Sequence, residues 1–323
     1  MRLIQISEYD ERTMQLAKPV YDSHRRVLLG ANHRIHPKIL DRLIDMGIRI
    51  LFIEDAESRG ITMEEMMDMP TWLDVVQVVR ECFDAASAKK PLAVKPVLAA
   101  AGKLIAEMKQ RPVLVPIPTT TVPAELKAYA HAVNVALLSL QIGKHLGYNE
   151  LQLRDLAVGC LLHDIGKAIA ADRAKHPEAG FELLRGIREL SLLSAHVAFQ
   201  HHETLDGEGF PRGLKGDVLE FAQICGLANL YENAVSERSL PPHEALEIVM
   251  TKNETAYAGK LVQAFVTGVP SYPPGTKVKL SNGFDAIVVR IEAHMHRPVV
   301  RLVSNETELP LADHPSVTVL QVC

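Results

Sequence analysis

The chain of 323 residues is longer than one ordinary domain, so we expect two or three domains. Its composition, 47% hydrophobic and 23% charged, is that of a globular protein with sizeable cores. With 35 basic and 39 acidic side chains there is no overall positive field, which argues against binding of long nucleic acid. The sequence contains neither a run of about 18 apolar residues nor a signal peptide, so we expect no membrane association and a cytoplasmic location.

Residues 1–111 mix strand and helix signals, and we expect them to form an accessory α+β domain. RRVLLGANHRI (25–35) predicts two strands around a turn, and KILDRLIDMG (38–47) predicts a short helix that Gly47 ends. IRILFIED (48–55) predicts a buried strand. Residues 71–110 predict helix with a break at Pro91 or Pro96, and we assign the nearby methionines, Met63, Met66, Met67 and Met69, to packing.

Two changes in composition divide the rest of the chain. Four prolines lie within residues 112–123, and they predict a linker because proline interrupts both helices and sheets. Residues 124–264 then follow a helical period and form the second predicted domain. Residues 272–323 predict a small all-β module, in which Asn282-Gly283 marks a hairpin.

The stretch LLHDIGK (161–167) follows an apolar helical stripe that runs directly into an aspartate. The stripe has the spacing i, i+3, i+4, i+7, i+8, and the next position in that series is Asp164. Its members are Leu153, Leu156, Ala157, Cys160 and Leu161. Because an unpaired carboxylate on a buried face is costly, Asp164 requires a partner. That partner is either Lys167, three residues further on, or a metal ion.

Histidines are concentrated in the same part of the chain. His131 heads a second apolar stripe, His176 begins HPEAG, and His201-His202 ends another helical segment. Together with His163-Asp164 they form a set of nitrogen and oxygen donors that borderline divalent metals favour. More than four ligands favour two metals over a single structural zinc, and two-metal sites carry out in-line displacement at phosphorus. Each residue taken alone also fits an ordinary core or surface position, and that alternative stays open.

The ordered series HD, IGK, HPEAG and HHETLDGEGFP, over roughly residues 124–245, resembles the HD-GYP subgroup of the HD-domain phosphohydrolases. The resemblance implies an HD-type helical bundle, so the predicted fold class is mainly α, with the α+β domain before the bundle and the β module after it. It also implies a bacterial signalling enzyme that hydrolyses cyclic di-GMP, or a related cyclic dinucleotide, to pGpG and/or GMP. The implied reaction is attack on phosphorus by a hydroxide that bridges two metals.

The same resemblance assigns roles to individual residues. The implied metal ligands are His131, His163, Asp164, His176, His201, His202 and Asn229. Asp164 would bridge two divalent metals, with iron or manganese favoured and zinc or nickel open. Lys167 would contact the scissile phosphate, so Asp164 and Lys167 are the predicted catalytic residues. The implied substrate-binding residues are Lys167, Gly209, Phe210, Pro211 and Arg238.

Several positions depart from the family pattern and keep a second interpretation open. Asn229 stands where the family has a metal-binding aspartate, Phe210 replaces the tyrosine of GYP, and Thr204 replaces an arginine. Lys127 replaces a glutamate that binds a third metal in some members, which favours two metals here. The alternative is a weakly active or inactive relative that binds a cyclic dinucleotide or a signalling protein. A phosphohydrolase of ordinary nucleotides and a homodimer also stay open.

Overall fold

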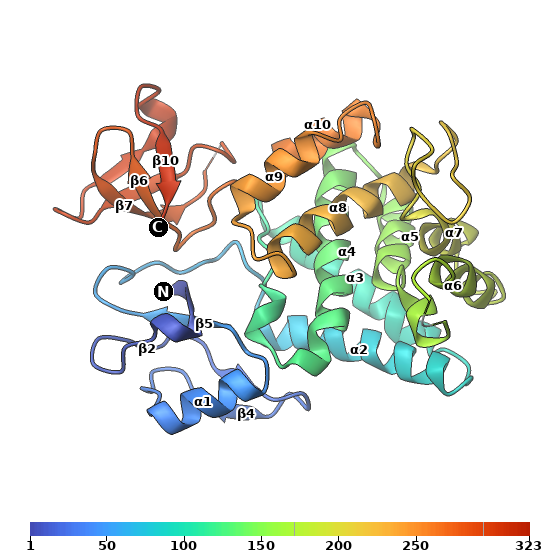
Figure 1. Ribbon diagram of the computed structural model, residues 1–323, viewed down its shortest axis with the longest axis horizontal. Coiled ribbons are helices and arrows are strands. Elements are labelled where there is room, and N and C mark those ends of the chain that lie inside the picture. The colour runs from blue at the N-terminus through green and yellow to red at the C-terminus, as the bar shows by residue number, and fades with distance from the viewer. Residues whose placement is uncertain (171, 293) are drawn as a thin grey trace.

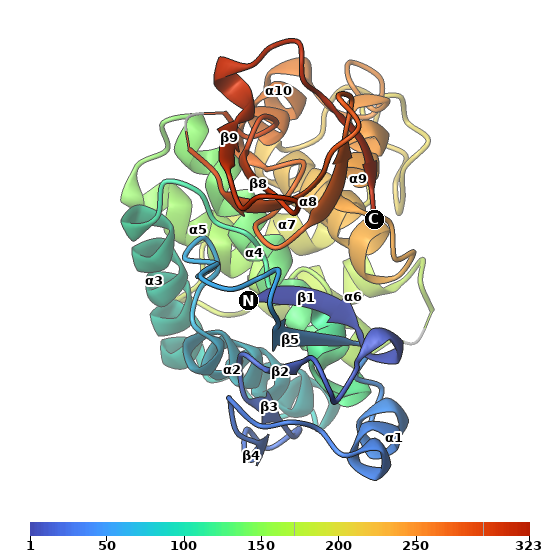
Figure 2. The same ribbon diagram turned by 90° about the vertical axis from the view of Figure 1, so that its left-hand side faces the viewer.

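A helical bundle forms one side of the molecule, and two smaller β-containing regions, one from each end of the chain, lie beside it (Figure 1). This computed structural model describes residues 1–170, 172–292 and 294–323. Viewed from the side of the two β regions, the C-terminal sheet lies above the N-terminal one (Figure 2). The predicted fold class, mainly α with flanking α+β and all-β parts, is confirmed. Every helix in the described part of the chain is too short or too polar to span a bilayer.

The N-terminal region contains a three-stranded antiparallel sheet in the order β1-β5-β2. Its strands are β1 (Arg2–Gln5), β5 (Ile50–Glu54) and β2 (Gln15–Leu16), and β5 is the strand predicted from residues 48–55. The short 3-10 helix η1 (Ile6–Glu8) follows β1. Buried aliphatic residues on one face of this sheet, which include Leu16 and Ile53, contribute to a separate small core.

Helix α1 (Pro37–Asp45) lies where a short helix was predicted, and Gly47 follows its end with a φ of 86°. The prediction of two strands in residues 25–35 was half wrong. The first forms as β4 (Val27–Leu29), which pairs with β3 (Val20–Tyr21). The second does not form, because Asn32 adopts a left-handed backbone with φ of 63° and turns the chain there.

Helices α2 (Met69–Ser87) and α3 (Val94–Gln110) fill the predicted helical stretch, and the break between them contains Pro91. Both helices pack against the central bundle and share its hydrophobic core. The four neighbouring methionines are buried in that core, which confirms that they serve packing. Since α2 and α3 share one core with the later helices, the domain boundaries given above stay a prediction.

The proline-rich segment 112–123 lies against the bundle, with apolar side chains such as Val113 and Ile117 almost fully buried. Two buried polar side chains of the bundle hold its backbone. Asn134 donates a hydrogen bond to the carbonyl of Ile117 (2.8 Å), and Gln141 donates one to the carbonyl of Leu114 (2.7 Å). The prolines break regular structure as expected, while these contacts fix the segment in place.

The bundle is arranged around α4, which packs against α2, α5, α8 and α10. Its helices are α4 (Lys127–His145), α5 (Glu150–Leu161), α6 (His176–Arg185), α7 (Leu192–Gln200), α8 (Glu220–Ser236), α9 (Pro242–Met250) and α10 (Gly259–Gly268). Two 3-10 turns, η2 (Thr119–Thr121) and η3 (Ala124–Leu126), lead into α4. Burial of α4 on nearly all sides fixes the position of any side chain that it carries toward a site.

The C-terminal region is a five-stranded antiparallel sheet in the order β10-β6-β7-β8-β9. Its strands are β6 (Lys277–Leu280), β7 (Asp285–Arg290), β8 (Val299–Leu302), β9 (Glu308–Pro310) and β10 (Val319–Val322). The 3-10 turn η5 (Leu311–Asp313) follows β9. The predicted hairpin joins β6 and β7, and Gly283 takes the positive φ (87°) that its turn requires.

The expected helix around His163-Asp164 was wrong in one respect. The apolar stripe is buried as predicted, but α5 ends at Leu161, and Asp164 precedes the 3-10 helix η4 (Ile165–Ala168). Gly166 explains the change, because a Cβ there would lie only 1.9 Å from the carbonyl oxygen of His176. The chain therefore leaves α5 early and brings η4 into backbone contact with the start of α6.

Candidate metal site

The six predicted histidine and aspartate ligands meet at one place between the helices. His131 comes from α4, His163 and Asp164 from the turn after α5, His176 from the first position of α6, and His201-His202 from the end of α7. Their ligand atoms form two groups, each with all atoms within 4.8 Å of one another. One group is Asp164, His176, His201 and His202, and the other is His131, His163 and Asp164. Asp164 belongs to both groups, as expected of a bridging carboxylate.

The carboxylate of Asp164 lies at the centre of the cluster. Its Oδ1 is 3.2 Å from Nε2 of His176 and 3.6 Å from Nε2 of His201, and its Oδ2 is 3.3 Å from Nε2 of His163. These three histidine side chains are 0% exposed and that of Asp164 is 9% exposed. Among the described residues, Oδ1 of Asp164 and Nε2 of His163 have no hydrogen-bond partner, which is unusual for buried polar atoms.

Backbone carbonyls fix the orientation of the same three rings. Nδ1 of His163 donates to the carbonyl of Cys160 (2.7 Å), Nδ1 of His176 to that of Arg173 (2.7 Å), and Nδ1 of His201 to that of Ala198 (3.0 Å). A carbonyl can only accept, so each Nδ1 donates a proton to it, and in the neutral form of each ring Nε2 keeps a lone pair. Nε2 of His176 lies 3.3 Å from Nε2 of His201, which places two lone pairs face to face. A cation between the donors would remove this conflict, so the residues fit a metal site.

The protonation states agree with metal binding. Burial would raise the pKa of Asp164, but the rings of His163, His176 and His201 outweigh burial and hold that pKa well below its ordinary value. Burial lowers the pKa of His201 to about 4, and it also lowers the pKa of His202. At neutral pH Asp164 is therefore a carboxylate, and His201 and His202 are neutral imidazoles, which are the forms of these groups that bind divalent metals.

Glu232 of α8 holds the remaining histidine, His131. Its Oε2 accepts a short hydrogen bond from Nδ1 of His131, which leaves Nε2 of that ring for a ligand. Burial lowers the pKa of His131, but the Glu232 carboxylate outweighs burial and raises it overall. The other oxygen of Glu232 accepts from Ser236 (2.5 Å) and from Asn134 (3.4 Å). Asn134 in turn accepts from the indole of Trp72 (3.1 Å), so α2 takes part in positioning the cluster.

The model of the HD domain family matches residues 128–244. Residues 128–244 are an HD domain. The HD domain contains all six clustered residues, and the predicted resemblance to the HD-GYP subgroup is confirmed by the relatives of this chain.

Two relatives match parts of this chain at the same identity. A cyclic di-GMP phosphodiesterase of Pseudomonas aeruginosa is 28% identical over 181 residues, which cover 50% of this chain and 44% of that protein. A cyclic di-GMP phosphodiesterase of Thermotoga maritima is 28% identical over 164 residues, which cover 44% of this chain and 45% of that protein. The matches thus span less than half the length of either relative.

One solved structure is similar over most of the chain. An HDG"Y"P protein from Bdellovibrio bacteriovorus aligns with a TM-score of 0.54 at 18% identity, over 81% of this chain and 97% of that one. At this identity the likeness concerns the fold.

Lys167 and Phe210 lie beside the cluster in the HD domain. Nζ of Lys167 is 2.5 Å from Oδ2 of Asp164, so the ordinary i, i+3 ion pair that the sequence left open does form. The lysine side chain is 53% exposed and so can also reach solvent or a ligand. The ring of Phe210 stacks on that of His202, with centroids 4.3 Å apart, and the guanidinium of Arg173 lies 5.8 Å from the Phe210 centroid.

The loop that carries Gly209, Phe210 and Pro211 is anchored by a residue to which the sequence analysis gave no role. Glu203 is buried, and its carboxylate accepts hydrogen bonds from the backbone of Arg212 (2.7 Å) and Leu214 (2.8 Å). A Cβ at Gly209 would lie 2.4 Å from the carbonyl oxygen of His202, so only glycine fits against the ligand backbone. In the sequence, Glu203 directly follows the predicted ligands His201 and His202, and this position could have indicated the anchor.

Two predicted residues make no described contact with the cluster. The side-chain oxygen of Asn229 accepts a hydrogen bond from Asn233 (2.9 Å). Arg238 is exposed, and its backbone N–H bonds to the carbonyl of Asn233 (3.2 Å). A metal-binding role for Asn229 and a substrate-binding role for Arg238 therefore stay predictions. Glu232 had no predicted role, and its contact with His131 could not be inferred from the spacing of residues in the sequence.

Proposed function

We propose that this chain is a metal-dependent phosphodiesterase that hydrolyses cyclic di-GMP to pGpG and/or GMP. The observation that supports it best is the buried Asp164 carboxylate shared by two groups of imidazole donors. Two divalent metals bound there would supply Lewis-acid stabilisation of phosphate charge and a nucleophile at neutral pH. The cyclic di-GMP phosphodiesterases that the chain resembles support the choice of substrate.

The residues of this chain would contribute binding and orientation. His131, His163, His176, His201 and His202 would hold the metals with Asp164. The ammonium of Lys167, now paired with Asp164, would turn its exposed end to a phosphate oxygen and stabilise developing negative charge. Phe210, fixed by its stack on His202, would offer an aromatic edge to a base beside the cluster.

The test is hydrolysis of cyclic di-GMP by the purified full chain supplied with Fe²⁺ or Mn²⁺, with products separated by chromatography. We expect pGpG or GMP from the wild type and none from His163→Ala or Asp164→Ala. His145→Ala is the matched control, because His145 is an exposed histidine of α4 outside the cluster. Intact substrate under every metal condition would reject the proposal.

Asn229 favours a second function, binding of a cyclic dinucleotide without efficient hydrolysis. An amide is a weaker metal ligand than a carboxylate, and its oxygen is already occupied by Asn233. In that case calorimetry would detect binding of cyclic di-GMP while the chromatogram shows intact substrate.

A further inference from the structure

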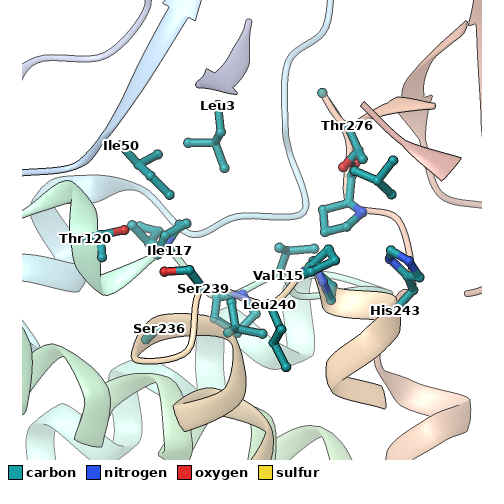
Figure 3. A pocket seen from close by; sticks show the side chains of 18 of the residues that line it. Leu3, Ile50, Val115, Ile117, Thr120, Ser236, Ser239, Leu240, His243 and Thr276 are labelled. Carbon is teal, nitrogen blue, oxygen red and sulfur yellow. Dashed lines mark hydrogen bonds between the residues drawn. The ribbon is translucent and has the colours of Figure 1, made fainter. Parts of the chain in front are cut away.

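A cleft of about 990 Å³ lies where the N-terminal region, the HD domain and the C-terminal sheet meet. Figure 3 shows Leu3 and Ile50 on one side, Val115, Ile117 and Leu240 toward the centre, and His243 and Thr276 on the other side. None of the six clustered residues lines it, but Glu232, which holds His131, does, so the cleft lies next to the candidate metal site. Its volume and its place between domains are typical of small-molecule sites.

Lys127 is the residue of the cleft whose charge needs explanation. It is half-buried at the start of α4, and among the described residues no carboxylate lies within 4.0 Å of its ammonium. Two other basic side chains that line the cleft already form ion pairs, Arg2 with Asp55 (2.9 Å) and Lys277 with Glu57. A half-buried ammonium without an acidic neighbour is unfavourable until an anion joins it.

The remaining polar groups of the cleft are consistent with a ligand there. Nδ1 of His243 is buried without a hydrogen-bond partner in the described part of the chain. The hydroxyls of Thr120, Ser236 and Ser239 also line the cleft. Three acidic residues of the lining, Glu8, Glu237 and Glu244, are exposed and so are well solvated at its edge. The fourth, Glu232, is buried, and its carboxylate is already bonded to His131, Ser236 and Asn134.

We propose that this cleft binds a small amphiphilic anion, with its anionic group at Lys127 and its apolar body against Leu3 and Ile50. Charge complementarity selects the anion, because the lysine inside the cleft is unpaired. Leu3 and Ile50 select the apolar body, because both side chains are only partly buried while the cleft is open.

Occupation of the cleft is linked to metal binding, and this step rests on the proposed function. Lys127 and His131 are four residues apart on α4, so their Cβ atoms are neighbours at about 6 Å. The free ammonium repels a divalent metal at His131, and a bound anion cancels that repulsion. An anion in the cleft therefore raises metal affinity, and by linkage the metal raises affinity for the anion by the same factor.

The test uses anilinonaphthalene sulfonate, a fluorescent amphiphilic anion, with the full chain in the presence and absence of Mn²⁺. Fluorescence gives the affinity for the dye, and electron paramagnetic resonance of free Mn²⁺ gives the affinity for the metal with and without saturating dye. The variants are Lys127→Ala and the matched control Lys95→Ala, an exposed lysine of α3 outside the cleft. Thermal melts followed by circular dichroism confirm that each variant is folded.

We expect saturable dye binding that Lys127→Ala weakens about tenfold and Lys95→Ala leaves unchanged. Saturating dye should raise the Mn²⁺ affinity of the weaker site about fivefold in the wild type and have no effect in Lys127→Ala. Dye binding that does not depend on Lys127 would overturn the anion site, and equal Mn²⁺ affinity with and without dye would overturn the linkage. If the chain takes up neither Mn²⁺ nor Fe²⁺ but binds dye through Lys127, the cleft is supported and the proposed metal-dependent phosphodiesterase function fails.

Discussion

Replacement of Glu232 by glutamine tests how the chain positions a metal ligand. Glu232 is an acceptor in all three of its side-chain contacts, with His131, Ser236 and Asn134. A glutamine has one acceptor and one donor end. If its NH₂ faces His131, the ring must accept at Nδ1 and carry its proton on Nε2, where the metal should bind. If the amide is flipped, its NH₂ faces the NH₂ of Asn134 instead.

Either arrangement weakens the hold on His131 in a place where water cannot compensate. The side chains of His131 and Glu232 are only 13% and 3% exposed. Loss of such a partner behind a metal-binding histidine costs about 10- to 100-fold in metal affinity. This corresponds to about 1.4–2.7 kcal/mol of binding free energy.

Isothermal calorimetry with Mn²⁺ measures the effect directly. We expect Glu232→Gln to weaken the site that contains His131 by that factor and to leave the site of His176, His201 and His202 nearly unchanged. Glu125→Gln, at an exposed glutamate before α4, should bind like the wild type. Equal affinities for Glu232→Gln and the wild type at both sites would refute the argument that Glu232 determines the state of His131.

Three further predictions concern the same site. Gly166→Ala should destabilise the fold by about 3 kcal/mol, because its Cβ would lie 1.9 Å from the carbonyl oxygen of His176. The control Gly102→Ala, in α3, should stabilise the fold by about 0.5–1 kcal/mol, because no atom lies within 4 Å of the added Cβ and alanine favours the helix. Denaturant titration of both variants measures these changes, and equal stabilities would contradict the close-contact explanation. Asn229→Asp should raise Mn²⁺ affinity about tenfold if Asn229 faces the metals, and calorimetry showing no gain would place it outside the ligand set. Removal of the metal by a chelator should lower the free energy of unfolding by about 2.7 kcal/mol if the metal had been present at about 100 times its Kd. More than two metal ions per chain before chelation would contradict the inference from Lys127 that the site holds two.

The elements that could be predicted from the sequence are those set by local patterns. The helix at α1 with its glycine stop, the break at Pro91 and the β6–β7 hairpin depend on residues that act on their immediate neighbours. The second strand predicted near Asn32 failed because a left-handed residue turned the chain, which alternating side chains do not reveal. The end of α5 was misplaced for a similar reason, since the contact of Gly166 with α6 is between segments distant in sequence.

The same distinction applies to the candidate site. Its metal ligands could be predicted from residue types, whereas the groups that orient these ligands depend on packing. The histidines and Asp164 could be selected because donors of one chemical kind followed apolar helical faces, and those faces converge in the fold. The atoms that orient them could not be selected, because every residue has a backbone carbonyl and nothing in the sequence distinguishes those of Cys160, Arg173 and Ala198. Glu232 is the clearest case, since it lies 101 residues from His131 in sequence and contacts it only because α8 packs against α4. A ligand set can thus be inferred from composition and periodicity, whereas the protonation state of each ligand depends on contacts that exist only after the bundle has folded.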